Sequence, residues 1–314
     1  MLRALNTGVT GIRQFQTNLD TIGNNLANVN TIGYKAGRVE FADTLNQTLR
    51  AGTPDSSTGL RSGTASVQVG NGVEVASVRN LFTQGAVSQT GVSTDLAISG
   101  EGFFIVKNAT GETFATRAGD FRVDKDGNLV TDQGLRVQGF SGPPAGADYA
   151  DTDTIGDINL NKPGTLPAGL PATAAGAGVT NVSIDSGGRI NMLLSDGTQF
   201  VRGQILLQRF TNPNALLKQG SNLYTGLTAA GPLTGTTATL PFGSSPAGTT
   251  TATASARATS NGLGRIDSGA LELSNVDIAR EFSNMIITQR AFQANARVVT
   301  TSDAILQEIV QLVR

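Results

Sequence analysis

Oxygen-bearing side chains gather at one point of the chain, in the run Asp124-Lys-Asp-Gly-Asn128. Asp, Asp and Asn at alternate positions are the ligands with which a calcium-binding loop begins. Such a loop also needs Gly at its sixth position and Glu at its twelfth, where this sequence has Leu129 and Leu135. An Asp-Gly pair between two strand-like segments is typical of a hairpin turn. We therefore predict a turn here and no metal site.

The acid–base and nucleophilic chemistry open to this sequence is narrow, because it contains neither histidine nor cysteine. Ser–His triads, His-ligated metals and thiolate sites are thereby excluded. Gly100-Glu-Gly102 precedes neither a helical pattern nor a Lys-Ser/Thr pair, so it matches no phosphate-binding signature. A carboxylate pair for glycoside hydrolysis stays open, although no tryptophan and only three tyrosines could form a sugar platform. We predict no catalytic residue, no cofactor and a non-enzymatic function.

The composition bounds the possible partners. The 314 residues are 39% hydrophobic, enough for a folded core, but only 15% are charged and the net charge is −1. No basic stripe is present for nucleic acid, and no apolar run is long enough for membrane insertion. The first residues also lack the apolar stretch of a secretory signal. A surface of small polar residues can be dehydrated against another subunit without burying ions.

The elements that would position such contacts begin with the N-terminal segment. Its apolar residues recur every seven positions, which predicts a helix with one apolar stripe within residues 1–33. Its glycines each weaken the helix by about 1 kcal/mol relative to alanine, so the helix should need a partner surface. The predicted assembly seam on this helix comprises Leu5, Ile12, Leu19, Ile22 and Leu26.

The C-terminal segment, residues 268–314, carries a longer heptad pattern. Ser274-Asn-Val-Asp277 has the form of a capping box and predicts a helix from about residue 275. Heptads of this length favour a coiled coil, formed with the N-terminal helix or with the helices of neighbouring subunits. The seam residues predicted here are Ile278, Phe282, Met285, Phe292, Val299, Leu306, Val310 and Val313.

Between the helices the apolar period changes to two. Residues 76–225 read as strands joined by turns, which predicts a mainly antiparallel β body and an α+β fold with a helical, coiled-coil-like stalk. Residues 34–75 and 226–267 read as an extended and a low-complexity connector. Residues 142–178 are rich in Pro, Gly and Ala and predict an insertion or a reduced outer domain.

Four segments together resemble the bacterial flagellar rod and hook axial protein family. They are Asn24–Lys35, Thr94–Val106, Thr116–Val130 with its continuation to Phe140, and Ser268–Ile286 with Gln289–Asn295. The first resembles the family's signature turn after the N-terminal helix, and its residues are Asn24, Asn25, Asn28, Gly33, Tyr34 and Lys35.

The resemblance implies a structural subunit. Terminal helices of many copies would pack as coiled coils around a central channel, with the β body outside. The subunit would pass through the flagellar export apparatus and assemble with itself, with other axial proteins and with a hook or rod cap.

The resemblance leaves the place in the axis open. Gly269–Asp277 and Leu135–Phe140 look more like a hook protein, whereas the long Ser/Thr/Gly stretch within 42–75 is similar to distal-rod proteins and to some hook proteins. We expect the hook subunit, with the distal rod as the alternative. A surface adhesin with a helical stalk is the alternative of another class.

Overall fold

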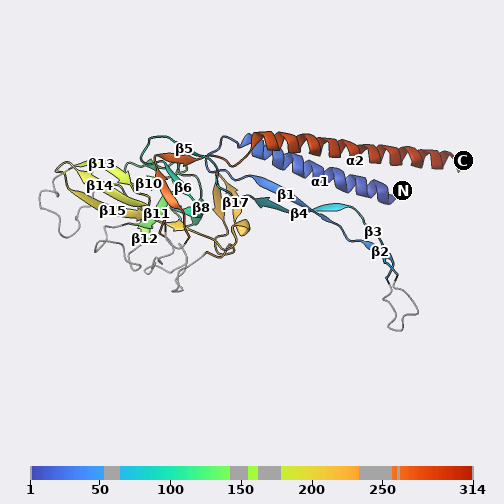
Figure 1. The fold of residues 1–314 in the computed structure, drawn as a ribbon, viewed down its shortest axis with the longest axis horizontal. Coiled ribbons are helices and arrows are strands. Elements are labelled where there is room, and N and C mark those ends of the chain that lie inside the picture. Colours follow the sequence, from blue (N-terminus) through green and yellow to red (C-terminus); the bar gives the residue numbers. More distant parts are fainter. Residues whose placement is uncertain are drawn as a thin grey trace, which may run out of the picture. The chain divides into compact units, whose positions relative to one another are not determined.

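The computed structural model describes residues 2–52, 64–141, 155–161, 178–232, 257–259 and 262–312. Within them a long helix lies near each end of the chain, with a mainly antiparallel β body between, as the sequence predicted (Figure 1). The chain divides into two compact units. We call residues 1–29, 36–81 and 276–314 the helical unit, and residues 30–35 and 82–275 the body.

The helical unit contains α1 (Leu2–Ala27) and α2 (Ile278–Leu312). The two helices are antiparallel, since Gly8 lies against Val299 whereas Asn18 donates a hydrogen bond to Thr288 Oγ1 at 3.0 Å. Helix α2 begins after Asp277, whose carboxylate accepts the amides of residues 279 and 280 at 3.0 and 3.2 Å. The cap is therefore Asp277, three residues after the serine that the sequence suggested.

A two-stranded ribbon completes the helical unit. Strand β1 (Gly37–Asp43) pairs with β4 (Val73–Asn80) around a bulge after Glu40, and β2 (Gln47–Arg50) pairs with β3 (Val67–Val69). The rings of Phe15 on α1 and Phe41 on β1 lie 5.8 Å apart, so the ribbon packs beside the helix. Strands β1 to β3 therefore lie within the segment that the sequence presented as an extended connector.

The body is built on one antiparallel sheet. Its main path runs β13-β14-β15-β11-β7-β8-β18-β17. The bounds are β13 (Val179–Ile184), β14 (Arg189–Leu194), β15 (Gln199–Ile205), β11 (Arg136–Phe140), β7 (Phe103–Lys107), β8 (Thr113–Thr116), β18 (Leu223–Thr225) and β17 (Leu217–Gly220). Off this path lie β9 (Arg122–Val123), β10 (Leu129–Val130), β12 (Ile155–Asp157) and β16 (Leu207–Gln208).

The C-terminal part of the body closes onto earlier strands. Strand β19 (Arg265–Ser268) pairs with β6 (Leu96–Ser99), and β20 (Ala270–Glu272) pairs with β5 (Val87–Gln89). These pairings join segments roughly 170 to 185 positions apart in the sequence, so the body contains strands from both sides of the low-complexity segment.

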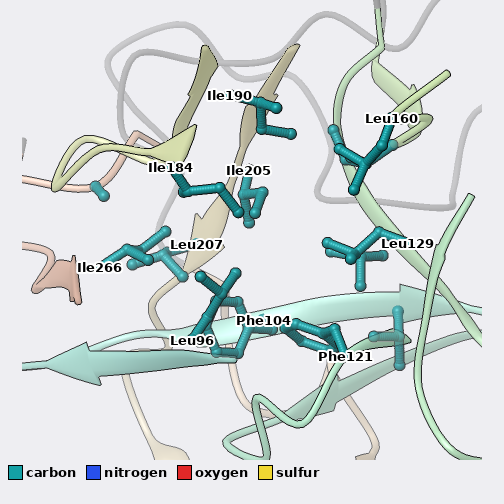
Figure 2. Packing of buried hydrophobic residues seen from close by; sticks show 14 of the residues in the cluster. Leu96, Phe104, Phe121, Leu129, Leu160, Ile184, Ile190, Ile205, Leu207 and Ile266 are labelled. Atoms are coloured by element: carbon teal, nitrogen blue, oxygen red, sulfur yellow. The ribbon is translucent and has the colours of Figure 1, made fainter. Parts of the chain in front are cut away.

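The core of the body lies on both faces of β7. Phe104 and Val106 belong to the larger apolar cluster, whereas Phe103 and Ile105 belong to a second cluster that includes Tyr224. Figure 2 shows Phe104 and Phe121 side by side, and their rings meet edge to face at 5.1 Å. Aromatic pairs in this geometry contribute about 0.5–1.5 kcal/mol beyond their burial.

The run Asp124-Lys-Asp-Gly-Asn128 forms the predicted turn. The Gly127 amide donates to the Asp124 carbonyl at 2.8 Å, and Gly127 has a φ of +84°. Asn159 Nδ2 donates to the Asp126 carbonyl and to Asn128 Oδ1, each at 2.9 Å. Polar groups of the turn therefore bond to a neighbouring segment of the body.

Two predictions fall mostly outside the described residues. They concern the insertion at 142–178, of which residues 155–161 and 178 are described, and the low-complexity segment 226–267, of which 233–256, 260 and 261 are not. In the described part of the chain, neither helix combines the length and the apolar character that crossing a bilayer requires.

Candidate assembly surfaces and the signature turn

The contact between α1 and α2 is centred on small and polar residues. A Cβ added to Gly8 would lie 3.1 Å from Val299 Cγ2, and one added to Gly11 would lie 2.7 Å from Asn295 Nδ2. The buried residues of α2 are Thr288 and Ser302. Gly8 and Gly11, which weaken α1 as an isolated helix, therefore allow a close helix–helix approach.

The predicted seam residues of α1 lie at or beside this contact. Ile22 is 4% exposed and is buried together with Gly8, Gly11 and Asn25. The column of Leu5, Ile12, Leu19 and Leu26 runs along the flank of that face, and all four are partly exposed. The leucine column is therefore only partly covered within one subunit.

The predicted seam residues of α2 divide into two groups. Met285, Phe292, Val299 and Leu306 are partly buried. Ile278 and Phe282 are each 47% exposed and Val310 is 66% exposed, while Val313 lies outside the described residues. Of these seam residues, Val299 lies against Gly8 of α1. The seam prediction did not include the polar residues Thr288 and Asn295, which contact α1, or the buried Ser302.

Further apolar residues of α2 face solvent. Exposed positions recur along the helix at Ile286, Ile287, Val298, Ile305, Ile309 and Leu312. A helix that carries apolar residues around much of its circumference is typically buried on more than one side. Exposed apolar surface that extends over neighbouring residues is typical of interaction sites.

The ribbon adds a second apolar surface to the helical unit. Its exposed residues are Phe41, Leu45, Leu49, Val67 and Val78. Every residue of β2 is exposed, and the described partner of each ribbon strand lies on one side only. Unpaired strand edges of this kind can pair with another chain.

The signature turn begins in the helical unit with three asparagines. Asn28 Nδ2 donates to the Asn24 carbonyl at 2.9 Å and to Asn24 Oδ1 at 2.8 Å, at the end of α1. The Asn25 side chain is 1% exposed and bonds both backbone groups of Gly37, each at 2.8 Å. A side-chain amide is suited to this position because it offers one donor and one acceptor, as a strand partner would.

The rest of the signature turn belongs to the body. Gly33 has a φ of +68°, and a Cβ there would lie 2.6 Å from the Ala118 amide nitrogen. Tyr34 is buried, and the Lys218 amine lies 4.3 Å from its ring centre and donates to the Lys35 carbonyl at 2.7 Å. This is a cation–π geometry, which fixes the turn against β17.

Lys35 ends the signature turn as a fully buried cation. Its Nζ lies 2.6 Å from Glu272 Oε1 and donates to the Thr83 carbonyl at 2.8 Å. Glu272 is equally buried, and its Oε2 lies 3.4 Å from Arg117 Nη1, while Oε1 also accepts the Gly85 amide at 2.8 Å. We call Lys35, Thr83, Gly85, Arg117 and Glu272 the Glu272 cluster.

The electrostatics of the Glu272 cluster follow from burial. Loss of solvent lowers the pKa of Lys35 and of Arg117, and the carboxylate of Glu272 opposes that change in both. The Arg117 guanidinium also lies 5.1 Å from the centre of the Phe103 ring. Sequence analysis found Lys35 but missed Glu272 and Arg117, since no local pattern marks a charge pair separated by 237 positions.

Three family profiles match the chain. They are described as "Flagella basal body rod protein" over residues 5–35, "Flagellar hook protein FlgE/F/G D1 domain" over 97–192, and "Flagellar basal body rod FlgEFG protein C-terminal" over 267–312. In chain order, they cover the N-terminal helix and signature turn, the first part of the body, and the C-terminal strands with α2.

Curated relatives match the whole chain. The flagellar basal-body rod protein FlgG of Bacillus subtilis is 37% identical over 314 residues, which cover all of both chains. In Borreliella burgdorferi, the rod protein FlgG is 35% identical and covers 98% of this chain and 97% of its own length. The hook protein FlgE of the same organism is 30% identical over 464 positions and covers 99% of this chain and all of its own.

These relatives are structural proteins of the flagellum rather than enzymes. Their full-length identity, together with profiles that match both terminal segments and the body, identifies the chain as a member of the flagellar rod and hook axial protein family, a structural subunit of the axis formed by the basal body and hook.

Proposed function

We propose that this chain is a distal rod subunit of the flagellar basal body and that its copies polymerise through their terminal helices. The observation that carries the rod assignment is the full-length match to rod proteins. The alignment with the Bacillus subtilis rod protein spans 314 residues and all of both chains. This supports the alternative of the sequence analysis over its main expectation of a hook subunit.

The hook relative differs in length. Its alignment spans 464 positions against the 314 residues of this chain, so at least 150 positions have no residue of this chain opposite them. The rod protein of the same organism matches at 35% identity over 307 residues, without such an excess. The sequence features that favoured the hook, Gly269–Asp277 and Leu135–Phe140, lie in regions that rod and hook profiles share.

The helical unit supplies the contacts for polymerisation. The exposed apolar residues of α2 and the half-buried leucines of α1 can be covered by the same helices of neighbouring copies. Burying a large apolar side chain contributes about 1.5–3 kcal/mol relative to leaving it exposed. Several such residues per contact, added over more than one neighbouring copy, would therefore offset an entropic cost of association of about 4–15 kcal/mol.

The partner that we propose is a second copy of this chain, followed along the axis by related axial proteins. The family membership supports this choice, because rod and hook relatives share the terminal segments that carry the exposed surfaces. No observation in the described residues favours the adhesin alternative. The sequence of this chain is similar to axial proteins instead.

Immunogold labelling of isolated hook–basal bodies tests the rod assignment. Antibodies raised against the purified chain should label the rod segment, after removal of the rings that surround it, and leave the hook unlabelled. Label along the hook would contradict the rod assignment and restore the hook reading. An antibody to the hook protein of the same cells serves as the matched control for access and specificity.

A further inference from the structure

The chain passes between the helical unit and the body after residues 29, 35, 81 and 275. On the body side, these passages leave three segments: Asn30–Lys35, the segment beginning at Phe82, and the segment that ends at Asn275. The three segments are far apart in sequence, and each contributes to the Glu272 cluster or its immediate neighbours.

Glu272 belongs to the segment that ends at Asn275, and it contacts the other two segments directly. Its backbone carbonyl accepts the Gly33 amide at 2.8 Å, and its side chain bonds Lys35 Nζ and the Gly85 amide. The neighbouring contacts repeat this linkage, since Asn275 Nδ2 donates to Thr83 Oγ1 at 2.9 Å. Glu272 of β20 therefore joins Asn30–Lys35, which precedes the two-stranded ribbon in the sequence, to the segment beginning at Phe82, which follows the ribbon.

The backbone of the segment beginning at Phe82 packs closely against the backbone that follows Glu272. A Cβ added to Gly85 would lie 2.0 Å from the Leu273 carbonyl oxygen, so the two backbones touch. The Leu273 amide donates to the Ala86 carbonyl at 2.8 Å, which continues the pairing of β20 with β5. The segment beginning at Phe82 is therefore held by the backbone and the side chain of the same C-terminal strand.

The buried positions of Lys35 and Arg117 depend on the charge of Glu272. Two cations, Lys35 and Arg117, share one carboxylate, and the side chains of all three are at most 4% exposed. Without Glu272 both buried cations would lose the carboxylate that pairs with them, and a buried charge that loses its partner is strongly unfavourable. Lys35 and Arg117 can therefore hold their buried positions only when β20 is docked. Glu272 of β20 follows Lys35 by 237 positions in the sequence.

We propose that Glu272 is a positioning residue that makes the three segments at the passages order together, and only after the C-terminal strand of the body has docked. The inference concerns folding of the single chain, so it holds for a rod and for a hook subunit alike. It assigns the family signature lysine a buried partner and gives that pair the task of completing the body.

Hydrogen exchange of the full-length chain, measured by mass spectrometry, tests the proposal. In Glu272→Gln, amides in 30–35, 82–86 and 270–275 should exchange at least tenfold faster than in the parent chain. In Lys35→Met, which leaves a neutral Arg117–Glu272 pair, only segment 30–35 should exchange faster. Glu112→Gln is the matched control, because it removes an exposed carboxylate of the same unit that is not part of the Glu272 cluster.

The double variant Glu272→Gln/Lys35→Met separates charge from shape. Because it buries one unpaired cation fewer than Glu272→Gln, its three segments should exchange more slowly than those of Glu272→Gln. Should Glu272→Gln yield no folded body, recovery of folded protein in the double variant replaces exchange as the measurement. Faster exchange confined to 270–275 in Glu272→Gln, or no recovery in the double variant, would overturn the proposal.

Discussion

At the scale of single residues, both the backbone conformation and the close packing at position 33 of the signature turn require glycine. Its φ is +68°, and an added Cβ would lie 2.6 Å from the Ala118 amide nitrogen. Gly33→Ala should lower the free energy of unfolding by roughly 2–5 kcal/mol, since left-handed backbone costs about 1–2 kcal/mol and overpacking adds about 1–3 kcal/mol. Denaturant unfolding of the purified chain measures this loss.

A matched glycine separates the two contributions. Gly134 has a φ of +78°, but an added Cβ would meet nothing within 4 Å. Gly134→Ala should therefore cost only the conformational part, about 1–2 kcal/mol. Equal losses for the two variants would show that the close approach of Gly33 to Ala118 has no energetic weight.

Lys218 gives the body a pH dependence of defined sign. Burial of its amine against Tyr34 and the Lys35 carbonyl lowers the pKa of Lys218 from 10.5 to about 8. Between about pH 8 and 10.5 the unfolded chain therefore binds more protons at this group than the folded chain does. The contribution of Lys218 to stability should rise with pH across that window.

The measurement compares the parent chain with Lys218→Met. Denaturant unfolding measures the free energy of unfolding at pH 7.5 and 9.5. Between these values the change should be more positive for the parent chain than for the variant, because methionine cannot titrate. The difference between the two chains cancels the titration of all other groups. Parallel pH profiles would contradict an amine with a lowered pKa.

At the scale of elements, α1 contains glycines with opposite roles. Gly23 has no atom within 4 Å of an added Cβ, so Gly23→Ala should stabilise the helix by about 1 kcal/mol. A Cβ added to Gly11 would lie 2.7 Å from Asn295 Nδ2, so Gly11→Leu should force the helices apart and lower the stability of the helical unit by about 1–3 kcal/mol. Circular dichroism during thermal unfolding reports both changes, and a stabilising Gly11→Leu would refute the close approach.

The sequence predicted elements whose pattern is local. The heptads at both ends became α1 and α2, and a mainly antiparallel β body formed between them in the sequence. The Asp-Gly turn at Asp126 also formed, because its geometry depends on adjacent residues. The start of α2 moved to residue 278, since the Asp277 carboxylate takes the first free amides.

What the sequence could not reveal depends on residues far apart in the chain. The Lys35–Glu272 pair joins positions 237 apart, and burial of both charges leaves no periodic signal. The helix contact centred on Gly8, Gly11 and Asn295 was hidden for a related reason, because heptad analysis weighs large apolar residues. Leu5, Ile12, Leu19 and Leu26 remain predicted seam residues, and we propose that their partners lie in other subunits.

At the scale of the whole molecule, the exposed apolar residues of α2 should matter for assembly and not for the single subunit. Ile287 is 65% exposed, so Ile287→Asp should change the stability of the monomer by less than about 0.5 kcal/mol. In a polymer the same aspartate would be buried among apolar helices, which is strongly unfavourable. Cells carrying Ile287→Asp should therefore lose swimming and produce no axial structure beyond the point where this subunit is added.

The exposed polar residue Gln293 on α2 provides the control. Gln293→Asp introduces the same charge without replacing an apolar side chain, so swimming should be retained. Loss of swimming in both variants would indicate a general intolerance of charge on α2. Normal swimming with Ile287→Asp would refute the role of this exposed residue in assembly.

The rod assignment is tested most directly by electron microscopy of flagellar basal structures from cells that lack this gene. If the chain is a distal rod subunit, the distal part of the rod and the hook beyond it should both be missing, and reintroducing the gene should restore both. A complete rod without a hook would contradict the rod assignment and identify a hook subunit instead.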